Sequence, residues 1–165
     1  MTKRINYRNL PALLLKVREN ILGQFRPIIS HFGLTEQQWR ILRMLDEMGD
    51  LEQRELSEAC QILGPSLTGI LSRMEEMGLI IRARMAEDQR RMTVSISGLG
   101  EKIVEAMSPL VTQQYRNVAD AYGPELITEL FEVMDRFLAT EPAPIAQVKL
   151  PEPNKMDPEI LKLLK

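Results

Sequence analysis

Cysteine and histidine are nearly missing from this chain, and their scarcity excludes most routes to catalysis and metal binding. The 165 residues include one cysteine, Cys60, and one histidine, His31. A lone cysteine cannot form a disulfide within the chain or supply a cysteine-rich zinc site. The sequence also lacks a glycine-rich phosphate-binding loop. We therefore expect no metal site, no cofactor and no enzymatic activity.

Long apolar runs are missing too. No stretch approaches the roughly 18 consecutive apolar residues of a membrane-spanning helix. Residues 1–4 are not followed by the apolar core of a signal peptide. Hydrophobic residues make up 44% of the chain and charged residues 27%, which is typical of a globular protein. The composition predicts a cytoplasmic protein that does not contact a membrane.

The formal net charge of -2 gives the chain no general attraction to nucleic acid. The two parts of the chain differ, however. Residues 1–100 contain 14 Lys and Arg against 12 Asp and Glu, whereas residues 101–165 contain 7 against 11. Any surface that binds DNA must therefore be local.

Apolar residues recur at helical spacing through the first half of the chain. They predict a helix over residues 8–32, with a kink or fresh start near Pro27, which lacks the backbone N–H that a helix interior needs. Thr35 and Gln38 have the spacing of a capping box at the start of a second helix, which ends near Gly49. Two further helices are predicted, over residues 52–59 and from Pro65 to residue 77.

The second half begins with a strand pattern. Residues 80–85 and 92–96 read as two short strands joined by a charged tip at residues 86–91. Ser97 starts a long helix that reaches about residue 121, and another helix follows over residues 126–138. From Glu141 onward, repeated prolines predict an extended or disordered tail.

This order of elements predicts a mainly α fold with a small β-hairpin, the wing. Residues 35–98 form a winged helix-turn-helix DNA-binding domain. They are flanked by an N-terminal dimerisation helix in residues 1–34 and C-terminal dimerisation helices in residues 99–140, followed by the proline-rich tail, 141–165. The flanking helices carry more apolar residues than a short domain needs, which favours a homodimer.

The helix after Pro65 has the slim polar face that a recognition helix needs in a major groove. We expect this face to contact DNA through Pro65, Ser66, Thr68, Gly69, Ser72 and Arg73. Taken alone, the same residues would also suit an ordinary solvated helix face. The hairpin shifts the balance, because Arg90 and Arg91 at its tip can reach phosphates or the minor groove. Asp88 is expected to brace one of these arginines through a charge-assisted pair.

In their linear order, six segments resemble the multiple antibiotic resistance regulator (MarR) family: residues 34–42 (LTEQQWRIL), 56–59 (LSEA), 67–71 (LTGIL), 77–82 (MGLIIR), 88–91 (DQRR) and 98–100 (GLG). Within the family, residues 25–27 (FRP), 34–41 and 62–71 (ILGPSLTGIL) look like the homoprotocatechuate-degradation operon regulators. The resemblance implies a dimer that presents two recognition helices and two wings to a palindromic operator in double-stranded DNA. It also implies repression that is relieved by a phenolic acid such as 4-hydroxyphenylacetate or 3,4-dihydroxyphenylacetate. Ser97 stands where the family usually has Thr, and the tail lies outside the match.

An aromatic carboxylate needs a guanidinium for its charge and an aromatic wall for its ring. The candidates for such an effector site are Arg18, His31, Trp39, Arg40 and Arg43. Each has a simpler alternative: His31 suits a helix C-terminus, Trp39 suits a core, and the arginines suit surface ion pairs. Cys60 has no neighbouring cation in sequence and is interpreted as a structural residue. The main alternative function is a winged-helix protein-interaction module that does not bind DNA.

Overall fold

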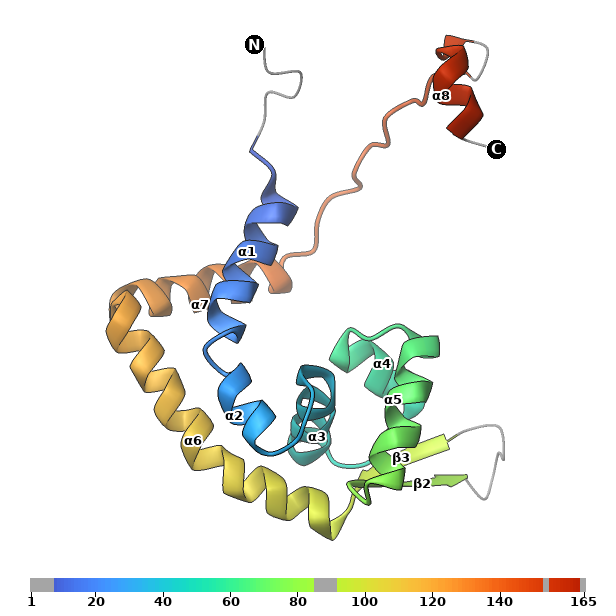
Figure 1. Cartoon of the computed structure of the whole chain (residues 1–165). Coiled ribbons are helices and arrows are strands. Elements are labelled where there is room, and N and C mark those ends of the chain that lie inside the picture. The colour runs from blue at the N-terminus through green and yellow to red at the C-terminus, as the bar shows by residue number, and fades with distance from the viewer. Residues whose placement is uncertain (1–7, 85–91, 153–154, 164–165) are drawn as a thin grey trace. The chain divides into compact units, whose positions relative to one another are not determined.

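The computed structural model describes residues 8–84, 92–152 and 155–163 (Figure 1). The chain divides into two compact units, Met1–Pro124 and Glu125–Lys165. The first unit contains the predicted helix-turn-helix and hairpin, and the second contains the helices near the C-terminus.

Two helices replace the bent helix predicted over residues 8–32. Helix α1 (Leu10–Leu22) is capped by Asn9, whose side chain accepts a hydrogen bond from the Ala12 N–H at 3.0 Å. Helix α2 (Arg26–His31) starts afresh after a turn. Pro27 lies in the first turn of α2, where its missing N–H costs nothing. The predicted break near Pro27 is therefore confirmed.

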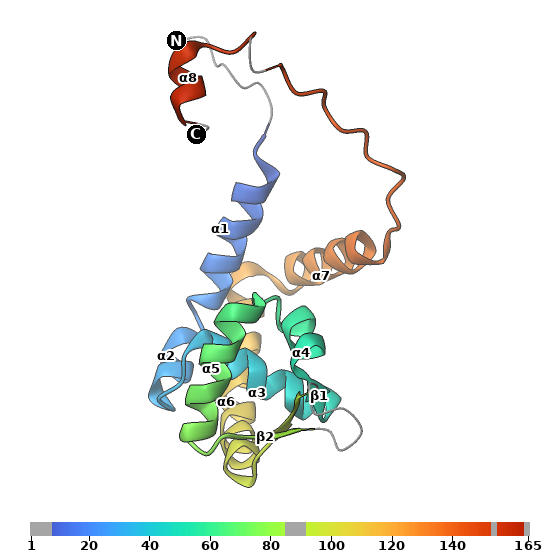
Figure 2. The same ribbon diagram turned by 90° about the vertical axis from the view of Figure 1, so that its right-hand side faces the viewer.

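The core gathers around α3 (Glu36–Met48), which contacts α4 (Gln53–Cys60) and α5 (Gly64–Glu76) (Figures 1 and 2). The predicted capping box at the start of α3 is present: the Gln38 N–H donates to Thr35 Oγ1, and the Thr35 N–H donates to Gln38 Oε1. The helices meet through fully buried side chains, among them Ile41, Leu42, Leu45, Leu56, Leu67, Leu71 and Met74.

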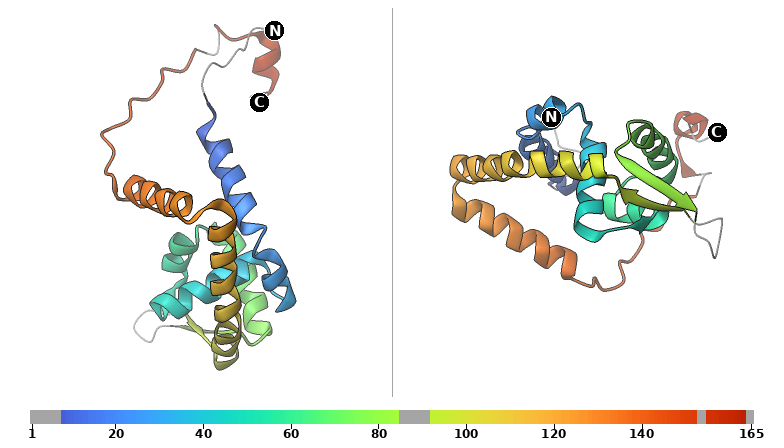
Figure 3. Two further views of the ribbon diagram at one scale, coloured as in Figure 1. Left: turned by 90° about the vertical axis from the view of Figure 1, so that its left-hand side faces the viewer. Right: turned by 90° about the horizontal axis from the view of Figure 1, so that it is seen from below.

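A small antiparallel sheet closes one side of this core (Figure 3). Strands β2 (Ile80–Arg84) and β3 (Met92–Ile96) form the predicted hairpin, with Ile80 opposite Ile96. A third strand, β1 (Leu51–Glu52), pairs with the other edge of β3. Sequence analysis missed β1 because a strand of two residues has no measurable alternation.

Helix α6 (Gly98–Tyr122) begins directly after β3. Ser97 caps it as predicted: its Oγ accepts from the Gly100 N–H at 3.1 Å and donates to the Gly78 carbonyl at 2.6 Å. The same side chain therefore fixes the helix start against the turn that ends α5. Gly100 is buried at this junction.

The second unit contains most of α7 (Pro124–Ala139) and a short helix, α8 (Pro158–Leu163). Every residue of α7 is described, and none is buried. The prediction that the tail holds no regular structure is wrong for residues 158–163. Pro158 is the first residue of α8, the one helical position at which proline is well tolerated.

Candidate functional site

The predicted DNA-contacting face of α5 is a continuous polar surface of the first unit. Pro65, Ser66, Thr68, Gly69 and Arg73 are exposed, and Ser72 is half-buried. The opposite face buries Leu67, Leu71 and Met74 in the core. Nothing lies within 4 Å of the position that a Cβ on Gly69 would occupy. The outer face of α5 is thus slim and open, as entry into a major groove requires.

Thr68 is held in place by a neighbouring helix. Its Oγ1 accepts a hydrogen bond from Gln53 Nε2 at 2.8 Å and donates to the Gly64 carbonyl at 3.2 Å. Gln53 is the first residue of α4, so this contact ties the two helices of the helix-turn-helix together at the outer face. Sequence analysis did not identify Gln53, because the contact spans two helices.

The hairpin is joined to α5 by an ion pair. The Arg82 guanidinium on β2 donates through Nε to Glu75 Oε2 at 2.8 Å, and it lowers the pKa of the Glu75 carboxyl. Asp88, Arg90 and Arg91 lie outside the described residues, so their roles at the wing tip stay predictions. The strands that lead to and from that tip, β2 and β3, are in place.

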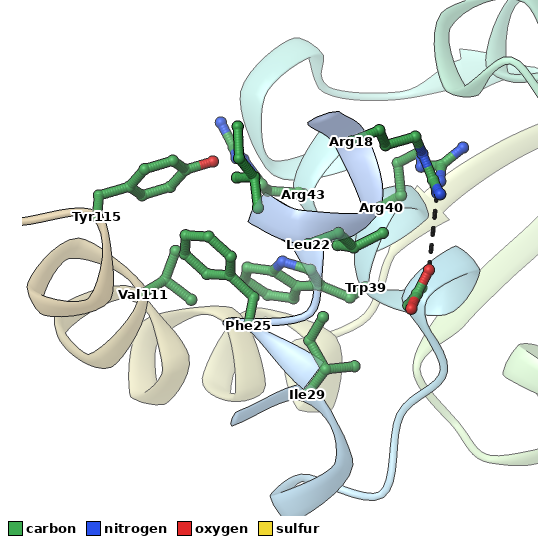
Figure 4. Close-up of a pocket in the computed structure, with 11 residues that line it drawn as sticks. Arg18, Leu22, Phe25, Ile29, Trp39, Arg40, Arg43, Val111 and Tyr115 are labelled. Carbon is green, nitrogen blue, oxygen red and sulfur yellow. Dashed lines mark ion pairs between the residues drawn. The ribbon is translucent and has the colours of Figure 1, made fainter. Parts of the chain in front are cut away.

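A cavity of about 350 Å³ opens between α1, α2, α3 and α6 (Figure 4). It brings together four of the five predicted effector residues: Arg18 from α1, and Trp39, Arg40 and Arg43 from α3. The other lining residues are Ile21, Leu22, Phe25, Ile29, Glu36, Val111 and Tyr115. Three arginines and a single glutamate line the cavity, so it carries net positive charge beside aromatic walls.

Not all of these arginines are equally available. Arg18 forms ion pairs with Glu19 and with Glu36, the latter at 3.6 Å and drawn dashed in Figure 4. Glu19 and Glu36 also bind Arg26, which lowers the pKa of Glu19. This network of two arginines and two glutamates fastens α1 and α2 to the start of α3.

Arg43 pairs with Glu47 at 2.7 Å, one turn further along α3. Burial acts against its charged form, but Glu47 and Tyr115 outweigh burial and raise its pKa. Both partners of the Arg43–Glu47 pair are nearly half exposed, at 46% and 49% of their side-chain surface. Such exposed pairs contribute little, so Arg43 can exchange Glu47 for a ligand.

His31 is the predicted effector residue that the structure places elsewhere. It is an exposed residue at the end of α2, its ring is 5.4 Å from that of Phe32, and it does not line the cavity. Phe25 and Tyr115 were missed by sequence analysis, yet their rings meet across the cavity wall at 4.6 Å. Tyr115 and Val111 are four residues apart on α6, which is the only signal that would have grouped them.

Two further observations concern other kinds of site. Cys60 is buried, and burial raises the pKa of its thiol, which agrees with a structural residue.

Among the described residues, no three His, Cys, Asp or Glu side chains gather as metal ligands. No helix in the described part of the chain is both long and apolar enough to cross a membrane.

Comparison with known proteins identifies the fold's relatives. A family model described as the MarR family matches residues 34–92, from the end of the turn before α3 to the start of β3. The transcriptional regulator FarR of Neisseria gonorrhoeae is 39% identical over 129 residues, which cover 74% of this chain and 88% of that protein. The homoprotocatechuate degradative operon repressor of Escherichia coli is 36% identical over 131 residues, which cover 79% of this chain and 88% of that protein.

A solved structure gives the same result in three dimensions. NadR in complex with 4-hydroxyphenylacetate superposes with a TM-score of 0.72 at 35% identity, covering 86% of this chain and 100% of that chain. The mainly α winged-helix fold expected from the sequence is thereby confirmed. With more than 30% identity over most of the length of these regulators, the chain belongs to the MarR family of transcriptional regulators.

Proposed function

We propose that the protein is a dimeric repressor of an aromatic-acid catabolic operon, and that a phenolic acid releases it from its operator. As a MarR-family regulator the protein is not an enzyme. The ligand class is inferred from the cavity of Figure 4, which is lined by three arginines and by aromatic side chains. Guanidinium groups pair with carboxylates, and indole and phenyl rings pack against an aromatic ring.

The DNA-binding part of the proposal assigns α5 to the major groove of a palindromic operator. The outer face of α5 is polar, slim and exposed, and the sequence between β2 and β3 contains Arg90 and Arg91. Residues 35–98 bind DNA, and residues 1–34 and 99–140 form the dimer. A two-fold dimer sets its recognition helices about 34–36 Å apart, one turn of duplex. Because the protein acts on operator DNA, its proposed location is the cytoplasm.

The effector is a small acid with a phenolic hydroxyl. The Escherichia coli relative is named for homoprotocatechuate (3,4-dihydroxyphenylacetate) degradation, and the NadR structure contains 4-hydroxyphenylacetate. In this chain, Arg43 is the proposed anchor of the carboxylate because its own pair with Glu47 is exposed and weak. Trp39 and Phe25 flank the ring. Glu36, the single carboxylate of the cavity, is an acceptor for the phenolic hydroxyl.

The test is a titration of the protein against its own upstream intergenic DNA, with and without 4-hydroxyphenylacetate or 3,4-dihydroxyphenylacetate. We expect saturable binding that falls steeply with salt, because phosphate contacts release counterions, and that either acid weakens. Salt-sensitive binding that ignores both acids would reject the ligand class. Failure to bind any upstream fragment would favour the protein-interaction module instead.

The anchor is tested separately by calorimetry. Arg43→Gln should weaken binding of 4-hydroxyphenylacetate by about tenfold or more, because a hydrogen bond to a charged group contributes about 1.5–3 kcal/mol. Arg116→Gln is the matched control, since Arg116 is exposed on α6 and does not line the cavity. Equal affinities for the two variants would remove Arg43 from the site.

A further inference from the structure

We propose that Arg40 is a positioning residue that links the cavity to the turn of the helix-turn-helix. In the free protein its guanidinium holds the last carbonyl of α4, and an anionic effector in the cavity draws it away. This inference rests on the proposed function, because it explains how an acid bound near α1 and α6 lowers the affinity of α5 for DNA.

Arg40 touches both regions at once. It lines the cavity with Arg18 (Figure 4) and also an adjoining hollow that Arg18 and Glu36 share. Its NH1 donates a hydrogen bond to the carbonyl oxygen of Cys60 at 2.9 Å. Cys60 is the last residue of α4. One half-buried side chain on α3 therefore joins the cavity wall to the end of the neighbouring helix.

The Cys60 carbonyl needs an outside partner. After it, Gln61 adopts a left-handed conformation with φ of 51°, and the chain turns back. The N–H groups of Gln61 and Ile62 then bind the carbonyls of Glu58 and Ser57, at 3.2 and 3.1 Å. These bonds satisfy earlier carbonyls of α4 but not that of Cys60. Helix α4 also has no basic residue in its last turn, so Arg40 supplies the positive charge that a helix C-terminus favours.

The turn held by Arg40 directly sets the start of α5. Only residues 61–63 separate α4 from α5, and Ile62 between them is buried. The first turn of α5 contains Pro65 and Ser66, two of the predicted DNA contacts. Movement of the Cys60 carbonyl is therefore separated from the start of the predicted DNA-contacting helix by only three residues.

Arg40 is also free of any described carboxylate that an effector would first have to displace. Arg18 and Arg43 already pair with carboxylates, whereas the partner of Arg40 is a neutral carbonyl and no described carboxylate forms an ion pair with it. A carboxylate binds a guanidinium more strongly than a neutral carbonyl does. Arg40 and Arg43 are three residues apart on α3 and so are neighbours on its surface. Both residues line the cavity that the acid would occupy.

The first arm of the test measures the turn without DNA. Arg40→Met keeps the apolar stem but removes the donor, and we expect faster hydrogen exchange at the amides of Gln61 and Ile62. Adding 4-hydroxyphenylacetate to the wild type should accelerate the same amides, and adding it to Arg40→Met should not. Arg40→Lys, which keeps a charged donor, should restore part of the protection. Unchanged exchange at these amides in Arg40→Met would overturn the proposal.

The second arm measures DNA affinity without effector and at saturating 4-hydroxyphenylacetate. Arg40→Met should bind DNA about tenfold more weakly without effector, in line with the loss of a charge-assisted hydrogen bond, and the acid should add little further loss. Arg43→Gln should need more acid but reach the full loss at saturation. If 4-hydroxyphenylacetate lowers the DNA affinity of Arg40→Met as much as that of the wild type, the proposal is overturned. If the wild type ignores the acid while Arg40→Met still loosens the turn, the positioning role stands and the proposed effector is rejected.

Discussion

Gly100 shows how one missing side chain fixes the junction between the sheet and α6. A Cβ at this position would lie 2.3 Å from the Leu79 carbonyl oxygen and 2.8 Å from Ile96 Cγ1. The first of these is a backbone atom, which cannot swing aside. Because Gly100 has no side chain, the start of α6 packs closely against the turn after α5. Ser97 binds the same turn through the Gly78 carbonyl.

We predict that Gly100→Ala lowers the free energy of unfolding by about 1–3 kcal/mol, the usual cost of overpacking a core. Denaturant titration of the free energy measures the effect. The matched control is Gly98→Ala two residues earlier, where nothing lies within 4 Å of the added Cβ. It should be neutral or stabilising by a few tenths of a kcal/mol, because alanine loses less backbone entropy than glycine. Equal losses in the two variants would contradict this account.

Residue chemistry predicted much of the cavity but not all of it. Arg18, Trp39, Arg40 and Arg43 were grouped because a phenolic acid needs charge and aromatic walls, and they do line one cavity. His31 was grouped for the same reason, yet it is exposed at the end of α2. Tyr115 was missed, because its approach to Phe25 depends on how α6 packs against the first helices, which no local pattern encodes.

At the scale of elements, the Arg82–Glu75 ion pair couples α5 to the hairpin of β2 and β3. The pair joins the C-terminal end of α5 to β2. Arg82 lowers the pKa of Glu75 below the ordinary value of 4.5. The stabilisation is therefore fully present above pH 4.5 and is lost as the pH falls through the lower pKa of the folded state.

We predict that Glu75→Gln lowers the melting temperature at neutral pH and that this difference shrinks as the pH falls below 4.5. Thermal melts across that pH range measure it. Glu76→Gln, which changes the neighbouring exposed carboxylate, should show a smaller and flatter difference. A gap between wild type and Glu75→Gln that widens toward acid would show that the pair does not stabilise the fold.

Most elements could be predicted because their ends have strong local signals. The Thr35 capping box, the Ser97 cap and Pro27 each act within a single turn of helix, so sequence alone reveals them. Strand β1 exists only because β3 offers it an unpaired edge, and α8 begins at a proline that was taken as a breaker. The first error comes from a contact between distant segments and the second from the position of a proline within a helix, and local composition reports neither.

At the scale of the whole molecule, the exposed apolar side chains of α7 support a homodimer. Phe131, Val133, Phe137 and Leu138 all have about half or more of their surface exposed in the single chain. Apolar surface of this extent in a helix with no buried residue calls for a partner. A second copy of the chain is also the partner that the proposed palindromic operator requires.

We predict that the wild type has twice the 18.9 kDa mass of one chain in light-scattering measurements, and that Phe137→Glu shifts it toward the monomer. DNA binding should then weaken by a factor of about 100 or more, because two linked half-site contacts become independent. Glu132→Gln is the control on the same helix and should remain dimeric. A Phe137→Glu variant that stays dimeric with full DNA affinity would place the interface elsewhere.

The chain contains one tryptophan, and that tryptophan is Trp39 in the cavity wall. All tryptophan emission of the protein therefore comes from a residue in the wall of this cavity. A phenolic ring packed against the indole would change the emission without any attached dye. Trp39 is thus a built-in optical probe. Its emission alone can follow the binding of each candidate acid, to the wild type and to variants with altered specificity.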